Sequence, residues 1–204
     1  MSDLIKYVKA RSAREPEFTD GLESGYTDFK AGALSRQELL QGAPMTNLHL
    51  TRVPATKVGM LIRRPAADVF EAFVNPDVTT KFWFTKGSGA LEVDRPVQWE
   101  WEMYGISIQV TAKIIEPNRR IVIEWPGAHG PTTVEWTFEP QADDSTFVTV
   151  TESGFTGDGD NLVKQVTGST EGFTLVLAGA KAYLEHGLQL NLVADRFPKG
   201  LEGH

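Results

Sequence analysis

The chain of 204 residues contains no cysteine. Disulfides, thiol nucleophiles and cysteine-based metal sites are therefore excluded. No run approaches the about 18 consecutive apolar residues of a membrane-spanning helix. Residues 1–18 lack the apolar core and the small-residue cleavage site of a signal peptide. These absences predict a soluble protein without a membrane span, and we expect it in the cytoplasm.

Positive charge is also scarce. Lysine and arginine number 20 against 27 aspartates and glutamates, which gives a formal net charge of −7. No segment is rich in lysine and arginine. Nucleic acids and anionic membrane surfaces bind clustered positive charge, so neither is an expected partner.

The four histidines form no metal-binding pattern. None has a second ligand at the spacing of a helical metal site, and no His-Glu-x-x-His occurs. We interpret them as solvated side chains at loops and helix ends and expect neither a metal nor a cofactor. The histidines are His49, His129, His186 and His204.

Sequence motifs for calcium binding, phosphate binding and serine catalysis are missing. Residues 157–161 look like part of a calcium loop but lack its glycine at position six and its glutamate at position twelve. Asp158 or Asp160 more plausibly caps a helix that begins at Asn161 or Leu162. No Gly-x-Gly-x-x-Gly, Walker or Gly-x-Ser-x-Gly sequence is present.

Residues 1–52 show no sustained periodicity. Ser35 and Glu38 have the spacing of a capping box, and Gly42 is placed to end the short helix that they would begin. Leu48 and Leu50 alternate with polar neighbours, which predicts a brief strand. We interpret residues 1–52 as an N-terminal arm, packed on the domain or partly mobile, and residues 53–204 as the domain itself.

Regular patterns begin after the arm. Residues 58–62 alternate as in a strand, and Pro65 suits the first position of a helix over residues 66–73. Residues 75–77, Asn-Pro-Asp, supply an N-cap, a proline at the first helical position and an acid in the first turn. A second short helix therefore leads into the aromatic residues 82–84.

Only strands are predicted in the next part of the chain. Short connections, a tight turn at residues 104–105, a loop at 126–131 and a polar turn at 142–144, imply an antiparallel meander. The expected strands are residues 96–103, 106–115, 120–125, 132–139 and 147–152.

A long helix closes the pattern. Apolar residues recur at i, i+3, i+4 and i+7 from Phe173 to Leu184, and Gly187 is placed to end the helix. A single amphipathic helix covers a wide sheet only if the sheet curls around it. The predicted fold class is α+β, with a curved antiparallel sheet of about six to seven strands around a long C-terminal helix.

The order of these elements and several local motifs resemble a known family. The motifs are residues 65–73 followed by Lys81-Phe82-Trp83, then residues 114–121, 149–155 and 171–173. Together they are similar to the START-like (SRPBCC) helix-grip proteins, in the branch of homologues of the activator of heat-shock-chaperone ATPase. The resemblance covers about residues 55–188 and implies a sheet that grips the C-terminal helix.

Tryptophan carries the main functional signal. Trp99, Trp101, Trp125 and Trp136 fall on neighbouring strands, on the face that would meet the helix. Such side chains either fill a core or line a cavity left open for another molecule. With the resemblance as the larger part of the support, we favour a lined cavity.

The leading hypothesis is a domain that binds a small apolar or aromatic molecule, lipids included, in a cavity between sheet and helix, without covalent chemistry. The residues expected to line this cavity are large and apolar, and we expect no catalytic residue among them. They are Phe70, Phe73, Phe82, Trp83, Trp99, Trp101, Met103, Trp125, Trp136, Phe155, Phe173 and Leu177.

Two alternatives remain open. The domain could be a partner of a heat-shock chaperone that acts through its surface, although residues 1–52 do not resemble the chaperone-binding domain of the genuine activators. It could also be a cavity enzyme of the cyclase or dehydratase type. Glu116 and Glu152, at strand ends, are the candidate acids or bases for that chemistry.

Overall fold

The computed structural model describes residues 48–200. The capping box at Ser35 and Glu38, with Gly42, lies outside the described residues. Leu48 and Leu50 belong to no strand, contrary to the sequence prediction. They lie at the start of the long helix, where the Leu48 N–H donates to Asp160 Oδ1 over 3.3 Å. No helix among residues 48–200 is long and apolar enough to cross a membrane.

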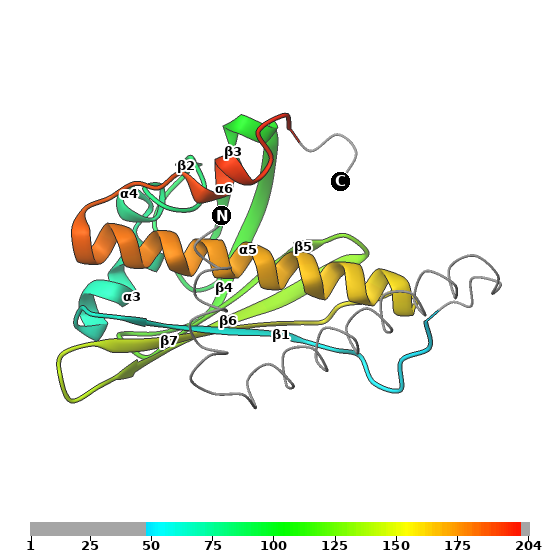
Figure 1. The fold of residues 1–204 in the computed structure, drawn as a ribbon, viewed down its shortest axis with the longest axis horizontal. Helices are drawn as coiled ribbons and strands as arrows, with labels where there is room; N and C mark the ends of the chain where they lie inside the picture. The colour runs from blue at the N-terminus through cyan, green and yellow to red at the C-terminus, as the bar shows by residue number, and fades with distance from the viewer. Residues whose placement is uncertain (1–47, 201–204) are drawn as a thin grey trace, which may run out of the picture. The chain divides into compact units, whose positions relative to one another are not determined.

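The fold is a single antiparallel sheet with one long helix lying across it (Figure 1). The sheet has seven strands in the order β1-β7-β6-β5-β4-β3-β2, and each strand pairs antiparallel with its neighbour. The strands are β1 (Thr56–Ile62), β2 (Lys86–Gly87), β3 (Pro96–Trp101), β4 (Ile106–Glu116), β5 (Arg120–Gly127), β6 (Gly130–Pro140) and β7 (Thr146–Ser153). The helices are α3 (Ala66–Val74), α4 (Pro76–Thr79), α5 (Gly159–His186) and α6 (Leu192–Arg196), with a 3₁₀ turn, η1, at Glu102–Tyr104.

The helix ends follow the sequence signals. Asn75 Oδ1 accepts the Asp77 N–H at the start of α4 over 3.0 Å. Asp158 Oδ1 accepts the Asn161 N–H at the start of α5 over 2.8 Å. Gly187 ends α5 with a φ of 68°, in the left-handed region that glycine adopts without strain.

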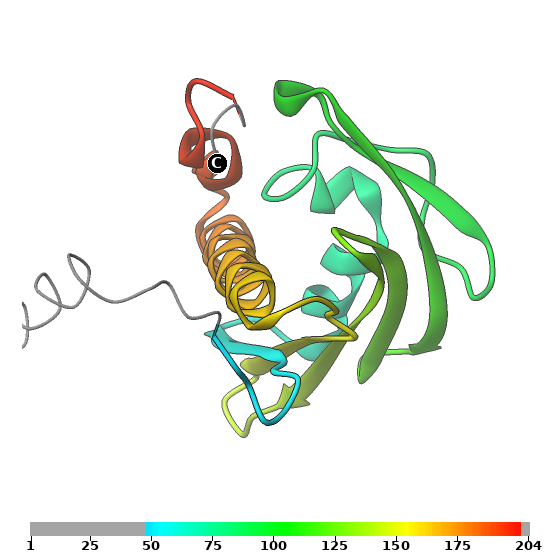
Figure 2. The ribbon, with the colours of Figure 1, turned by 90° about the vertical axis from the view of Figure 1, so that its right-hand side faces the viewer.

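The sheet curls around α5, as the helix-grip prediction requires (Figure 2). Strand alternation sends one set of side chains toward the helix. On β6, for instance, Val134, Trp136 and Phe138 are buried. The helix contributes Phe173, Val176, Leu177 and Ala180 to the same core. The α+β fold class and the curved sheet with a long C-terminal helix are therefore confirmed.

Strand β3 is shorter than predicted. It ends at Trp101, and Met103 lies in the 3₁₀ turn η1 instead of on the inward face of the strand. The turn closes at Gly105, whose φ of 64° is again left-handed. Reversing the chain here takes four residues, and the Glu102 N–H leaves the strand ladder to donate to Thr85 Oγ1 over 3.0 Å.

The predicted loop at residues 126–131 is a tight hairpin instead. Pro126 pairs with Pro131 and Gly127 with Gly130, so the ladder continues to a two-residue turn. Proline is tolerated at such a strand end because the last ladder positions do not require its missing N–H.

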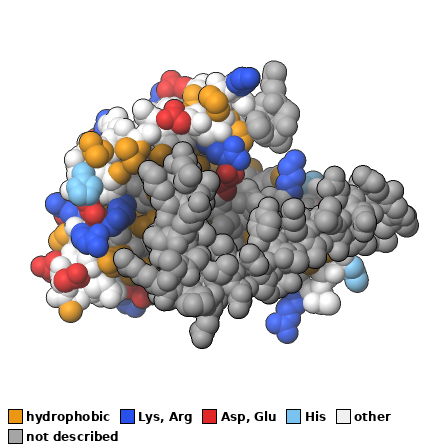
Figure 3. Space-filling model, viewed as in Figure 1, with side chains coloured by type: hydrophobic (Ala, Val, Ile, Leu, Met, Phe, Trp, Pro, Cys, Tyr) orange, Lys and Arg blue, Asp and Glu red, His pale blue; other side chains and the backbone are white. Residues whose placement is uncertain are grey.

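On the face shown in Figure 3, acidic and basic side chains are interspersed over the visible part of the described chain.

Candidate functional site

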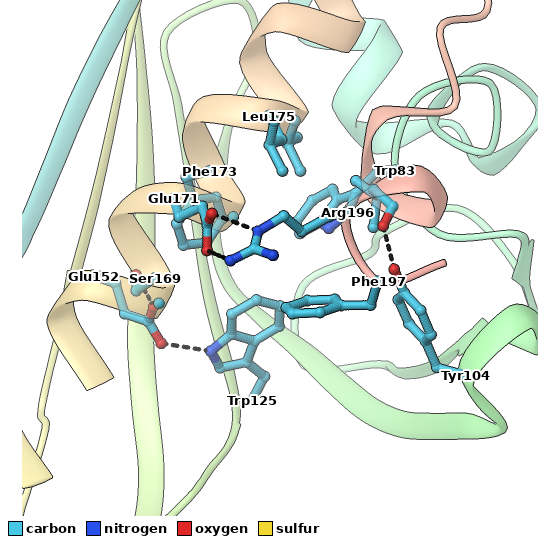
Figure 4. A pocket seen from close by; sticks show the side chains of 14 residues that line it. Trp83, Tyr104, Trp125, Glu152, Ser169, Glu171, Phe173, Leu175, Arg196 and Phe197 are labelled. Atoms are coloured by element: carbon cyan, nitrogen blue, oxygen red, sulfur yellow. Dashed lines mark hydrogen bonds and ion pairs between the residues drawn. The ribbon is translucent and has the colours of Figure 1, made fainter. Parts of the chain in front are cut away.

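A pocket of about 360 Å³ opens between α5, α6 and one end of the inner face of the sheet (Figure 4). It draws on segments far apart in the sequence, from the loop after α4 to the C-terminal residues. Its lining consists of Trp83, Tyr104, Trp125, Glu152, Gly168, Ser169, Glu171, Gly172, Phe173, Leu175, Val176, Val193, Arg196 and Phe197.

Three aromatic rings form one wall of the pocket. Trp125 of β5 stacks on Phe173 of α5, with ring centroids 5.8 Å apart and an interplanar angle of 24°. Trp83 meets both rings edge-on, at 6.1 Å from Trp125 and 6.0 Å from Phe173. Each ring thus packs against the other two, in the stacked and edge-on arrangements that aromatic pairs favour.

Glu152 is the buried polar group of the pocket, with 5% of its surface exposed. Its Oε1 accepts the Trp125 Nε1–H over 2.9 Å and the Thr132 hydroxyl over 2.6 Å. Its Oε2 accepts the Ser169 hydroxyl over 2.5 Å. These contacts tie β5, β6 and α5 to the end of β7 and place a carboxylate in the pocket wall (Figure 4).

Small residues on α5 leave the space that the pocket occupies. Gly168 and Ser169 lie about one turn before Gly172 on the face of α5 that lines the pocket. A Cβ atom added at Gly168 or Gly172 would meet nothing within 4 Å. The pocket therefore has open space beside Gly168 and Gly172, where the helix carries no side chain.

Residues that follow α5 also line the pocket, namely Val193, Arg196 and Phe197. We call α6 with Phe197 the C-terminal clasp. The Tyr104 hydroxyl donates to the carbonyl oxygens of Val193 and Ala194, and the Tyr104 ring meets Phe197 edge-on at 5.9 Å. Burial raises the pKa of the Tyr104 phenol, against smaller opposing effects of the Phe197 backbone and Arg196.

An ion pair joins the C-terminal clasp to α5. The Arg196 guanidinium donates to both carboxylate oxygens of Glu171, over 2.5 and 3.1 Å. This hydrogen bond raises the pKa of Arg196 above its ordinary value. The guanidinium carbon lies 4.5 Å from the centre of the Phe197 ring. The pair stands at the mouth of the pocket, where Figure 4 shows Arg196 reaching toward Glu171.

Only part of the predicted lining reaches this pocket. Trp83, Trp125 and Phe173 line it. Trp101 lines an adjoining groove of about 310 Å³ that shares Tyr104 and Trp125 with the pocket. Met103 is half-buried in η1, and Phe155 is buried beyond the end of β7.

The other predicted residues belong to the packed interior. The space between Phe73, Trp83, Trp99 and Trp136 is too small for a water molecule. Trp136 is 2% exposed, and within residues 48–200 its indole N–H has no hydrogen-bond partner. The predicted residues in this interior are Phe70, Phe73, Phe82, Trp99, Trp136 and Leu177.

The sequence prediction missed the C-terminal clasp, because five residues are too few to show helical periodicity. It also passed over Tyr104 as a turn residue. For Glu152 a signal was present: Val148 and Val150 are buried on β7, and strand alternation places residue 152 on the same inner face. Glu116, the other candidate acid, lies at the end of β4 and is 3.8 Å from Arg120.

The described residues offer no metal centre: residues 48–200 contain no group of three or more His, Asp or Glu side chains arranged to hold an ion. His129 sits in the β5–β6 turn, where its carbonyl oxygen accepts the Thr156 hydroxyl over 3.1 Å. His186 ends α5, with Nε2 3.6 Å from Glu185.

The curved sheet, the gripped helix and the pocket between them define a protein of the START-like (SRPBCC) helix-grip class. A family model described as "Activator of Hsp90 ATPase homolog 1-like protein" matches residues 63–185, more than half of the chain. The chain belongs to this family. The C-terminal clasp lies outside the matched residues.

Solved structures of similar proteins share the fold. Protein SSP2350 from Staphylococcus saprophyticus is 29% identical with a TM-score of 0.58, over 67% of this chain and 96% of that one. Protein MLL2253 from Mesorhizobium loti is 18% identical with a TM-score of 0.58, over 65% and 97%. The Aha1 dimer from Colwellia psychrerythraea is 19% identical with a TM-score of 0.56, over 66% and 98%. No curated protein matches the chain.

Proposed function

We propose that this domain binds a small, largely apolar molecule with an aromatic part, held without a covalent bond in the pocket between α5, the C-terminal clasp and the sheet. The observation that carries the proposal is the wall of Trp83, Trp125 and Phe173, which borders about 360 Å³ of space next to a core without such space. Ligand pockets are typically about 300–1,000 Å³, apolar, and equipped with a few placed polar groups.

The wall supports a ligand with a flat ring. Trp125 and Phe173 are nearly parallel, and Trp83 stands edge-on to both, so faces and edges of π systems are both presented. The lining contains few polar side chains. They are Tyr104, Glu152, Ser169, Glu171 and Arg196, and the last two form an ion pair. A ligand in this pocket would therefore be held mainly by apolar contact and oriented by one or two hydrogen bonds.

Of the two alternatives, the enzyme has one observation in its favour, because Glu152 lies in the pocket wall. Three hydrogen bonds from Trp125, Thr132 and Ser169 fix the position of its side chain, which suits a residue that orients a bound molecule. The chaperone partner is supported by the description of the family and not by a particular surface of this chain.

Calorimetric titration with a neutral aromatic probe, 2-naphthylmethanol, tests the proposal. We expect saturable binding to the full chain together with a change in tryptophan fluorescence. Gly172→Leu should weaken binding at least about tenfold because leucine would occupy the space over the aromatic wall. Thr174→Leu is the matched control, since Thr174 lies on the exposed face of α5 and its replacement should leave binding unchanged. Equal affinity in both variants, or no binding to the parent protein, would contradict the proposal.

A further inference from the structure

The carboxylate of Glu152, a residue of the pocket lining, retains hydrogen-bonding capacity. A carboxylate accepts about four hydrogen bonds, roughly two at each oxygen. Oε1 accepts two, from Trp125 and Thr132, whereas Oε2 accepts one, from Ser169. Glu152 also lines the pocket. Oε2 therefore accepts one hydrogen bond fewer than Oε1, and because Glu152 lines the pocket, a bound molecule could supply the further donor.

The partners of Glu152 leave its charge without a counter-charge. All three are neutral donors, an indole and two hydroxyls. The ion pairs found among residues 48–200 do not include Glu152. A buried carboxylate is costly without a cation because the protein interior screens charge poorly. The carboxylate would gain more from a cationic ligand than from a neutral one.

The rest of the pocket reinforces this preference. Two carboxylates and one guanidinium line it, and the guanidinium of Arg196 is bound by both oxygens of Glu171. One negative charge is thus left over, on Glu152. Next to that charge lie the rings of Trp125, Trp83 and Phe173. Aromatic faces attract cations electrostatically, tryptophan most strongly, so the wall and the carboxylate favour the same kind of group.

From this juxtaposition we infer that the pocket selects aromatic amines in their protonated form, with the ammonium group bound by Glu152 and the ring packed on Trp125 and Phe173. The inference rests on the proposed function, because it assigns a ligand class to the same pocket. The opposing interpretation is that Glu152 only clamps β5, β6 and α5 to β7 and takes no part in recognition.

Three probes with the same ring distinguish these interpretations: 2-naphthylmethylamine, 2-naphthylmethanol and 2-naphthylacetate. Calorimetric titration of the full chain at neutral pH should rank the amine about tenfold above the alcohol and the carboxylate last, as expected for one charge-assisted hydrogen bond. Glu152→Gln keeps the side-chain shape but removes the charge. It should abolish the preference for the amine while the affinity for the alcohol changes by less than about threefold.

Two further variants serve as controls. Glu139→Gln makes the same change of charge at an exposed position on β6 and should leave all affinities unchanged. Ser169→Ala frees a second acceptor position on Oε2 and should preserve or strengthen the preference for the amine. A thermal melt of each variant checks that it is folded.

The outcomes distinguish a pocket that selects amines from a pocket that binds aromatic molecules without regard to charge. If the alcohol binds as tightly as the amine, or if Glu152→Gln keeps the preference, the amine inference is wrong and the apolar pocket stands. If all three probes lose affinity equally in Glu152→Gln, Glu152 is a clamp and the inference is again wrong. If no probe binds to the parent protein, both the inference and the proposed function fail.

Discussion

The ring of Trp99 stacks on the ring of Phe84, with centroids 4.5 Å apart and an interplanar angle of 20°. Trp83 closes the same cluster, 4.9 Å from Trp99. Two tryptophans of strand β3 thus have different surroundings: Trp99 is 2% exposed in the packed interior, whereas Trp101 borders the adjoining groove. Two inward-facing residues of the same strand therefore differ: Trp99 lies in the core, and Trp101 lies beside open space.

This difference predicts unequal losses on truncation. Trp99→Ala should lower the free energy of unfolding by about 3–5 kcal/mol, because the packed neighbours cannot move far enough to fill the cavity that the ring leaves. Trp101→Ala should lower the free energy of unfolding by clearly less, since part of the Trp101 ring already faces the groove. Urea unfolding of both variants measures the difference, and equal losses would show that the two tryptophans are packed alike.

The glycines of α5 offer a second comparison. Gly172→Ala should stabilise the protein by about 0.5–1 kcal/mol, because alanine favours the helix and its Cβ would meet nothing within 4 Å. At Gly179 a Cβ would lie 3.1 Å from Phe82 Cβ and 3.2 Å from the Phe82 carbonyl oxygen. Gly179→Ala should therefore be destabilising. Thermal melts of the two variants test the pair, and a gain of stability in both would mean that Phe82 is free to move.

The buried end of Glu185 predicts a dependence of stability on pH. Burial on its own would raise the pKa of Glu185, but hydrogen bonds from Lys181 Nζ (2.5 Å) and the Arg63 N–H (2.7 Å) outweigh it and hold the pKa below its ordinary value of 4.5. A carboxyl with a lowered folded-state pKa stabilises the folded state above its unfolded pKa and loses that contribution as the pH falls through the folded value.

Glu185→Gln should therefore cost about 1–3 kcal/mol near pH 7, and the cost should shrink as the pH falls below the ordinary glutamate range. Urea unfolding of the parent and the variant over a series of pH values measures it. Glu139→Gln, at an exposed position, serves as the control. A difference between parent and Glu185→Gln that stays constant down to low pH would contradict this assignment.

The boundary between the N-terminal arm and the domain can be tested by deletion. Deleting residues 1–45 should leave a cooperative thermal transition, because the strongly periodic segments begin later in the chain. Extending the deletion to residue 53 should lower stability. The Leu48 carbonyl oxygen approaches Gly159 so closely that a Cβ there would lie 1.7 Å from it, and Leu48 donates to Asp160. Loss of the cooperative transition in the shorter deletion would assign the N-terminal arm to the core.

The C-terminal clasp should govern access to the pocket more than stability. Residues of α6 are not buried, so Tyr104→Phe, which removes the hydroxyl bound to Val193 and Ala194, should change the free energy of unfolding by at most about 1 kcal/mol. It should speed dissociation of a bound probe in stopped-flow fluorescence. A large loss of stability without a change in that rate would make the clasp a structural element only.

Local signals in the sequence were sufficient for most of the elements. The side chains of Asn75 and Asp158 cap helices because they reach the free N–H groups of the first turn, and Gly187 ends α5 because only glycine enters the left-handed region without strain. Such interactions span a few residues and are visible in the order of the amino acids. Residues 126–131 form a hairpin where the sequence predicts a loop, because their prolines indicate a break although the ladder continues through them.

The pocket, in contrast, depends on which segments meet. Alternation put Trp99, Trp101, Trp125 and Trp136 on the inward face, and that part is a property of the chain. Whether each ring meets other rings or open space depends on two further features. The helix α5 carries Gly168 and Gly172 beside the pocket instead of larger side chains. The C-terminal clasp is held beside the pocket by its contacts with Tyr104 and Glu171. The sequence by itself determined the longer strands, the capped ends of α4 and α5 and the inward faces, because these follow from steric and hydrogen-bonding preferences within a few residues, whereas the two-residue strand β2 and the helix α6 were not predicted. Only the tertiary structure decided which aromatic side chains are core and which are pocket wall, because an empty volume is defined by all the segments that surround it.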